Sequence, residues 1–161
     1  MATEFLIEGY NMKRTVFAVI ILLVTVFTLN GCSHDKNIPN GYINKEEYFD
    51  KNGFQDYTDY CKYYYSDKTP FEKDSSYQKV TESDIDNIKG YFSNFEEAMK
   101  AGERINEYDF DDNCITSGDY VKIITKEGTQ SSNAVYGKYD NYNVYFFDVD
   151  SGILYYIHTN I

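Results

Sequence analysis

An uncharged apolar block near the N-terminus is the feature that most constrains this chain. It runs from Thr15 to Leu29 (TVFAVIILLVTVFTL) and directly follows the basic residues Lys13 and Arg14. A helix that crosses the hydrocarbon core of a bilayer needs about 20 apolar residues, whereas the apolar region of a secretory signal peptide has about 7 to 15. The length of the block and its basic flank therefore predict a signal peptide. The alternative is a short membrane-spanning anchor that is not cleaved.

The position of the start codon affects the charge of this leader. If translation begins at Met12, the segment before the block carries two positive charges, as signal peptides require. If it begins at Met1, Glu4 and Glu8 cancel those charges. We therefore expect residues 1–11 to be a misplaced start. The alternative is an extended leader, which would change nothing downstream.

A four-residue motif, Leu29-Asn30-Gly31-Cys32, closes the apolar block with an aliphatic residue, two small residues and a cysteine. It resembles the lipobox of bacterial lipoproteins, and the resemblance covers residues 12–32. The family usually has Ala, Ser, Thr or Val where this chain has Asn30. The resemblance implies that residues 1–31 are removed and that Cys32 becomes an N-terminal diacylglyceryl cysteine, because a thiolate is nucleophilic enough to take the lipid.

The resemblance also implies a location for the mature chain. Each buried methylene of an acyl chain contributes about 0.8 kcal/mol, and two acyl chains give stable anchoring. The expected lipids on the cysteine are diacylglycerol and palmitate. A chain modified in this way is held on the extracytoplasmic face of the cell membrane. The membrane, reached through the lipid anchor, is therefore the first expected partner.

The net charge of −11 lies entirely beyond the predicted cleavage site. The 130 residues from Cys32 onward carry 13 Lys and Arg against 24 Asp and Glu. Nucleic-acid binding depends on basic residues that displace counterions from phosphate, and this chain has no basic segment of that kind. We therefore expect no nucleic-acid partner, and anionic lipid should repel the domain.

Composition divides the mature chain into two parts. Residues 32–46 are polar, contain a proline and a glycine and lack a hydrophobic period, so they predict a flexible tether. Residues 47–161 are long enough for one domain with a modest core. The expected organisation is a signal peptide over residues 1–31, a tether over 32–46, and a single acidic, tyrosine-rich domain over 47–161.

Two helices are predicted in the first half of that domain. The first lies between Tyr48 and Tyr65, where four residues at three- and four-residue spacing fall on one helical face. They are Phe54, Tyr57, Cys61 and Tyr64. The second, Ser83 to Ala101, follows a capping-box sequence from Thr81 to Asp84 and carries an apolar stripe. The stripe consists of Ile85, Ile88, Tyr91, Phe92, Phe95 and Met99.

Four strands are predicted in the last third of the chain, where β-branched and aromatic residues are dense. They are residues 120–125, 134–139, 144–148 and 153–158. Short turn sequences at Asp140-Asn141 and at Val149 to Gly152 favour antiparallel hairpins. The expected fold class is α+β, with two N-terminal helices followed by a four-stranded antiparallel sheet. We expect helices on one face of the sheet and tyrosines exposed on the other.

Tyrosine is unusually frequent, with 17 in the 130 mature residues, and the chain has no tryptophan. Tyrosine supplies rigid, amphipathic contact area at interfaces. Four tyrosines, namely Tyr63, Tyr65, Tyr145 and Tyr156, are therefore a candidate binding surface for a protein or a glycan. The alternative, favoured by their helical and strand spacing, is that they fill half-buried helix and sheet faces.

The segment from Asp109 to Asn113 is similar to the first half of an EF-hand calcium loop, with oxygen donors at Asp109, Asp111 and Asn113. The second half of the pattern is missing. Cys114 stands where the loop needs glycine, and Tyr120 stands where it needs the bidentate glutamate. No metal site is therefore predicted, and the segment is at most a weak cation candidate against a solvated acidic loop.

Cys61 and Cys114 are the only cysteines beyond Cys32. A disulfide between them is a candidate, because an oxidising exterior permits one and it would stabilise the chain by roughly 4 kcal/mol. The alternative is two unpaired thiols. The bond requires the two Cα atoms to lie about 4.4 to 6.8 Å apart.

Catalytic motifs are absent from the sequence. His158 is the only histidine in the predicted domain, and its place on a strand beside Leu154 and Tyr156 is typical of a structural histidine. No sequence of a nucleophile elbow, zinc protease, thiol redox pair or phosphate loop is present. We therefore expect no cofactor and a non-catalytic protein-interaction module bound to an envelope protein. A glycan-binding domain is the alternative, and a carboxylate-dependent hydrolase is less favoured.

Overall fold

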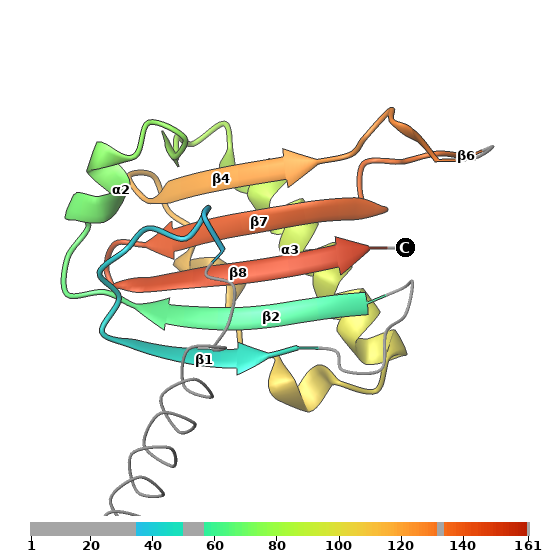
Figure 1. Cartoon of the computed structure of the whole chain (residues 1–161), viewed down its shortest axis with the longest axis horizontal. Helices are drawn as coiled ribbons and strands as arrows, with labels where there is room; N and C mark the ends of the chain where they lie inside the picture. The colour runs from blue at the N-terminus through green and yellow to red at the C-terminus, as the bar shows by residue number, and fades with distance from the viewer. Residues whose placement is uncertain (1–34, 50–56, 132–133, 161) are drawn as a thin grey trace, which may run out of the picture. The chain divides into compact units, whose positions relative to one another are not determined.

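A six-stranded antiparallel sheet forms the centre of the fold in the computed structural model, which describes residues 35–49, 57–131 and 134–160 (Figure 1). In spatial order the strands are β1 (Asn44–Tyr48), β2 (Tyr57–Tyr64), β8 (Ile153–Asn160), β7 (Asn141–Asp148), β4 (Tyr120–Thr125) and β3 (Gln78–Lys79). Two short strands, β5 (Gln130–Ser131) and β6 (Ala134–Val135), form a separate hairpin.

The helices lie on either side of this sheet. The helix α3 (Ile85–Ala101) packs behind it, and the short helix α2 (Thr69–Lys73) lies beside one end (Figure 1). Two 3-10 turns, η1 (Ile105–Glu107) and η2 (Asp112–Cys114), connect α3 to β4. Along the described part of the chain, the helices therefore all lie between β2 and β4, and that part ends with the consecutive strands β4 to β8.

The helix α3 confirms the prediction made for Ser83 to Ala101. Five residues of the predicted stripe are buried, namely Ile88, Tyr91, Phe92, Phe95 and Met99. The Asp84 carboxylate accepts hydrogen bonds from the Thr81 backbone N–H at 2.9 Å and from its hydroxyl at 2.6 Å. The Gly102 N–H closes the other end on the carbonyl of Ala98. Local capping and a helical apolar period therefore agree here.

The β7–β8 hairpin confirms the two strongest predicted strands, and both extend beyond their expected ends. The Asp148 carboxylate accepts hydrogen bonds from the N–H groups of Asp150 and Ser151 in the turn. Gly152 has φ +71°, and a Cβ at this position would lie 2.8 Å from the Tyr65 carbonyl oxygen. Glycine is therefore required both by the backbone conformation and by the close approach of the preceding chain.

Each face of the sheet carries its own hydrophobic core. On the α3 face, Tyr60, Val144 and Phe146 pack against the helix with other residues of one cluster. On the opposite face, Phe71 of α2 stacks on Phe147 with a ring separation of 3.8 Å. That second cluster also contains Ile38, which precedes β1. The expectation that one face would expose its tyrosines is therefore wrong over the part of the sheet that α2 and Ile38 cover.

The predicted helix between Tyr48 and Tyr65 is wrong. The structure has the end of β1 and all of β2 over the described residues of this segment. Both faces of β2 contribute to a core, since Tyr60 enters one core and Cys61 the other. A strand buried on both sides loses its alternating pattern, and the three- and four-residue spacing was coincidental in an aromatic-rich segment.

The predicted α+β order of two N-terminal helices followed by a four-stranded antiparallel sheet is therefore also wrong. The sheet has six strands among the described residues, and β1 and β2 come before the helices. β2 pairs with β8 from Tyr57 opposite Asn160 to Tyr64 opposite Ile153. Residues 134–139 form only the two-residue strand β6, while residues 120–125 form β4 as predicted.

The predicted tether of residues 32–46 ends earlier than expected. The compact unit begins at Ile38, which is buried, and β1 begins at Asn44. The Tyr65 hydroxyl donates a hydrogen bond to the Pro39 carbonyl at 2.6 Å. One buried isoleucine and backbone pairing to β2 hold this segment against the domain. Its polar composition gave no sign of these contacts.

Candidate functional site

A pocket of about 350 Å³ opens between α3 and the segment that contains η1 and η2. Aromatic and aliphatic side chains form part of its lining, and acidic side chains form another part. The lining residues are Phe92, Ser93, Glu96, Ile105, Tyr108, Phe110, Asp111 and Asp112. Its size suits one side chain or a small ligand, at the lower end of the range for ligand pockets.

Stacked aromatic rings form the apolar side of the pocket. Phe92, which is buried on α3, stacks on Phe110 with a ring separation of 3.9 Å and an interplanar angle of 16°. Phe110 also contacts Tyr155 of β8 edge-on at 4.8 Å. The Tyr108 hydroxyl donates to the Phe92 carbonyl at 3.4 Å. Rings from a helix, a strand and the connecting segment therefore hold this wall in place.

Carboxylates form the acidic side. The hydrogen bonds from the Asn113 backbone N–H and side-chain amide lower the pKa of Asp111, which keeps it ionised. Asp112 has Lys89 at 3.5 Å, and Glu96 has Lys100 at 2.6 Å. Both of these ion pairs are partly exposed, so they are weak and exchangeable. The pocket can therefore offer negative charge to a cation.

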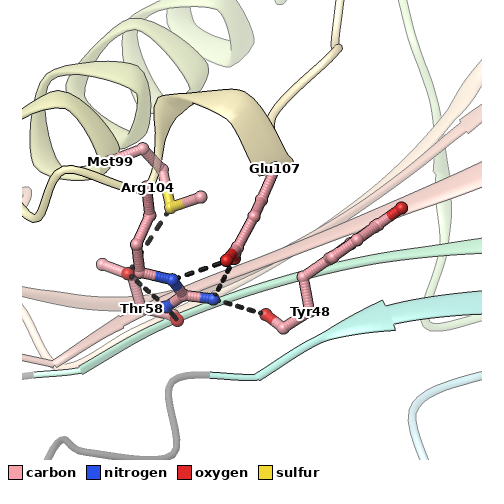
Figure 2. Close-up of polar contacts among 5 residues, drawn as sticks. All are labelled: Tyr48, Thr58, Met99, Arg104 and Glu107. Atoms are coloured by element: carbon pink, nitrogen blue, oxygen red, sulfur yellow. Dashed lines mark hydrogen bonds and ion pairs between the residues drawn. The ribbon is translucent and has the colours of Figure 1, made fainter.

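Arg104 fixes the start of the segment that closes the pocket (Figure 2). Its guanidinium donates to the backbone carbonyl of Thr58 at 2.7 Å and to that of Tyr48 at 3.1 Å. It also pairs with Glu107 at 2.6 Å. One side chain thus joins η1 to β1 and β2, and sequence reasoning did not identify it.

A buried lysine lies close to this segment on the same face of the sheet. The Lys62 ammonium is 2.8 Å from a carboxylate oxygen of Asp109 and 2.8 Å from one of Glu46. The Tyr60 hydroxyl donates to the other Asp109 oxygen at 2.7 Å, and the Tyr64 hydroxyl donates to Glu46 at 2.6 Å. Two carboxylates therefore bind the cation, and one tyrosine hydroxyl supports each carboxylate.

The titration behaviour of this cluster follows from its hydrogen bonds. Burial alone would lower the pKa of Lys62, but its bonds to Asp109 and Glu46 outweigh burial and raise it. The hydrogen bond from Lys62, together with that from Tyr64, lowers the pKa of Glu46. Burial would raise the pKa of Asp109, yet Lys62 and Tyr60 together lower it. All three charged groups are therefore ionised at neutral pH.

The oxygen donors of the candidate cation segment have other partners. Asp109 faces Lys62, whereas Asp111 accepts from the Asn113 backbone N–H and amide at 3.0 and 2.7 Å. Within the described residues, no three His, Cys, Asp or Glu side chains are grouped to hold a metal ion. The EF-hand likeness of Asp109, Asp111 and Asn113 therefore reflects a lysine partner and a local turn.

The four candidate surface tyrosines all lie on the sheet face opposite α3, but three of them are buried. The exposed fractions are 5% for Tyr63, 6% for Tyr65 and 1% for Tyr145. Tyr156 is half-buried and stacks on Tyr145 at 4.9 Å. The candidate binding surface is therefore wrong for three of its members, and the alternative of half-buried fillers describes them better.

Cys61 and Cys114 are not joined by a disulfide. Cys61 belongs to the core on the face opposite α3, whereas Cys114 packs against the core on the α3 face. The sheet separates them, so the candidate bridge between Cys61 and Cys114 is wrong. Burial is the main cause that raises the pKa of each thiol to about 12.

His158 lies in β8 on the same face as Leu154 and Tyr156, as predicted. It is buried, its Nδ1 lies 3.0 Å from the Tyr142 carbonyl oxygen, and its ring lies 4.8 Å from that of Tyr57. These contacts are those of a packed histidine in a sheet. The predicted lipid-attachment residue, Cys32, lies outside the described residues.

A scan of protein-family models and searches of curated proteins and solved structures each returned no significant match. Among the helices that the structure describes, none is both long and apolar enough to cross a membrane. The candidate site is thus defined by its own geometry.

Proposed function

We propose that this chain is a lipoprotein anchored through Cys32 on the extracytoplasmic face of a cell membrane. We further propose that its folded part is a non-catalytic module that binds a basic segment of another envelope protein. The observation that carries the second proposal is the pocket with an aromatic wall and an acidic wall. The first rests on the lipobox-like motif that ends at Cys32.

Lysine and arginine side chains match this pocket in their two parts. Each has an apolar stem and a cationic head. The stem would lie against Phe110 and Tyr108, where the aromatic faces also attract a cation. The head would reach Asp111 and Asp112 and compete with the weak pair that Asp112 makes with Lys89. The net charge of −11 would speed the encounter with a basic partner.

The reactive side chains of the described residues support a binding role over catalysis. The thiols of Cys61 and Cys114 have raised pKa values and are protonated at neutral pH, so they are poor nucleophiles. Lys62 is a charged ammonium held by Asp109 and Glu46. Asp119 is buried and accepts bonds from Thr116 and Val149, which is a structural role.

The pocket is tested with acetylated tetralysine as the probe peptide. Acetylated tetraglutamate is the control peptide of opposite charge. Neutralising two carboxylates, in the double variant Asp111→Asn and Asp112→Asn, is expected to weaken tetralysine binding about tenfold or more in a calorimetric titration. Asparagine retains the oxygen that accepts from Asn113, so the turn is preserved.

The matched control removes the same charge elsewhere. Asp150→Asn with Glu127→Gln changes two exposed carboxylates outside the pocket lining and should weaken binding by less than about twofold through net charge alone. If the control loses as much affinity as the pocket variant, binding is diffuse and the proposal for this pocket is wrong.

The anchor is tested by intact mass of the protein extracted from its native membrane. We expect a chain that begins at Cys32 and carries two acyl chains, recovered in the membrane fraction. Cys32→Ser should lose the lipid, whereas Cys61→Ser should keep it. Recovery of a chain that retains residues 1–31 with an unmodified Cys32 would show an uncleaved anchor and reject the lipoprotein proposal.

A further inference from the structure

The outer edge of β4 is only partly covered. The edge strand β3 pairs with it at two positions, Gln78 opposite Val121 and Lys79 opposite Tyr120. From Lys122 to Thr125, none of the strands that the structure describes pairs with this edge. Four of the six residues of β4 therefore have a partner strand on one side alone, which is β7.

The ladder geometry shows which backbone groups of this edge face outward. The Lys126 N–H donates to the Asn141 carbonyl, toward β7. Backbone groups alternate in direction along an antiparallel strand, so those of Ile124 also face β7 and those of Ile123 and Thr125 face away from it. The Asp119 carbonyl accepts from the N–H of Val80, which directly follows β3, so Asp119 also faces outward, as expected for a residue an even number of positions from Ile123 and Thr125. Two consecutive outward positions are therefore open to a further strand.

A groove of about 250 Å³ lies along this edge, beside the first residue of β3. Its lining comes from β4, from β3 and from the residue that precedes β3 by two positions. The lining residues are Ser76, Gln78, Val121, Lys122 and Ile123. The Asp74 carboxylate accepts from the Ser76 N–H at 2.9 Å, so the residues that precede β3 form a turn and do not pair with Ile123. The groove thus follows the path that a longer β3 would take.

This edge carries three lysines in an otherwise acidic chain, with the Asp74 carboxylate near Lys122 and Glu127 next to Lys126. Lys79 lies on β3, Lys122 on β4 and Lys126 directly after β4, whereas neither strand contains an acidic residue. The Lys122 ammonium is held 2.9 Å from the Ser76 hydroxyl and 5.7 Å from the Tyr77 ring centre. Lysines on an edge strand oppose pairing with an identical edge, so the charge favours an acidic partner over a second copy.

We propose that an extended acidic segment of another protein adds to the sheet beside β4 in this groove. Its backbone would bond the outward groups of Ile123 and Thr125, and its carboxylates would meet Lys122 and Lys126. Ile124, which is 38% exposed, lies between these two lysines on the same face of the strand and offers an apolar contact there. Strand addition of this kind takes its affinity from the backbone and its specificity from alternate side chains. The site is independent of the aromatic and acidic pocket.

The proposal is tested by amide hydrogen exchange with an acetylated seven-residue peptide that alternates glutamate with valine. Exchange at Ile123 and Thr125 is expected to slow at least about tenfold with the peptide bound, because those amides gain a partner. Exchange at Lys122 and Ile124 should stay unchanged, because they already face β7. Protection elsewhere, such as around Phe110, would overturn the assignment of this edge.

Two altered peptides and three variants make the test specific. The peptide methylated at alternate backbone nitrogens and the one with lysine in place of glutamate should each bind at least about tenfold more weakly. Thr125→Pro removes an outward N–H and should weaken binding similarly, whereas Thr125→Val keeps that N–H and should not. Lys122→Gln should weaken binding about threefold and reduce its salt dependence.

The remaining outcomes also decide the proposal. If the methylated peptide binds as tightly as the parent, backbone pairing is absent and the proposal fails, whatever the variants do. If the same amides are protected without peptide as the protein dimerises, a second copy occupies the edge and the acidic partner is rejected. The double variant Asp111→Asn and Asp112→Asn should leave binding of the acidic peptide unchanged. The proposal for the β4 edge and the proposal for the pocket are therefore tested independently.

Discussion

Replacing Lys62 with methionine is expected to lower the free energy of unfolding by about 3 kcal/mol at neutral pH. Methionine preserves the packing of the stem but leaves Glu46 and Asp109 without the cation between them. Only 10% of the Lys62 side chain is exposed. Breaking one partner of a buried ion pair costs about 3 to 5 kcal/mol, and the value here is at the low end because Glu46 and Asp109 are 37% and 64% exposed.

The loss should depend on pH in a defined direction. The folded protein holds the pKa of Glu46 and that of Asp109 below their usual values, so the unfolded chain binds protons more readily at these sites. Their contribution is present above a pH of about 4 and declines as pH falls through the lowered values. Urea unfolding at pH 7 and pH 3 should therefore show a smaller effect of Lys62→Met at pH 3.

A surface ion pair supplies the control for Lys62→Met. Lys68, at the N-cap of α2, and Glu72, one turn later, are both well exposed, so Lys68→Met should leave the free energy of unfolding nearly unchanged. An equal loss at pH 7 and pH 3 would contradict the assigned role, since the Lys62 effect would then come from packing and not from the two carboxylates. Burial raises the pKa of Asp119, so this group has the opposite effect on how stability depends on pH. Asp119 is present in both the parent protein and the Lys62→Met variant, so its effect cancels in the comparison.

The elements that the sequence predicted well are those whose signals are local. The helix α3 has a cap at Thr81 and Asp84, a helical apolar period and a terminal Gly102, all within 22 residues. The β7–β8 hairpin has dense strand formers and a turn that ends at Gly152. In both cases the local preference and the tertiary environment agree, which is the condition for a reliable prediction.

The elements that were missed depend on partners far away in the sequence. β2 pairs with β8 about 100 residues later, and burial on both faces removes its alternation. The sequence pattern indicated Asp109 as an oxygen donor to a cation, but its partner is Lys62, which lies 47 residues earlier. Glu46 stands opposite Lys62 only because β1 pairs with β2 in one register. No spacing rule within a segment carries this information.

Arg104 gives the second large effect that we expect. Arg104→Met should lower the free energy of unfolding by about 3 kcal/mol, because the carbonyls of Tyr48 and Thr58 both lose a charged donor. The side chain is mostly buried, with 16% exposed, so water replaces the guanidinium poorly. Urea unfolding measures the loss, and amide exchange should quicken first at the Tyr48 end of β1.

Two control variants separate the bridging role of Arg104 from its charge. Glu107→Gln removes only the partly exposed partner and should cost less than about 1 kcal/mol. Arg104→Lys keeps the charge but lacks the planar fork that reaches two carbonyls, so it should recover less than half of the loss. If lysine restores full stability, the contribution of Arg104 to the free energy of unfolding comes from its charge alone and not from its two bonds to backbone carbonyls. The pocket between α3 and η1 would then not depend on the link from Arg104 to β1 and β2.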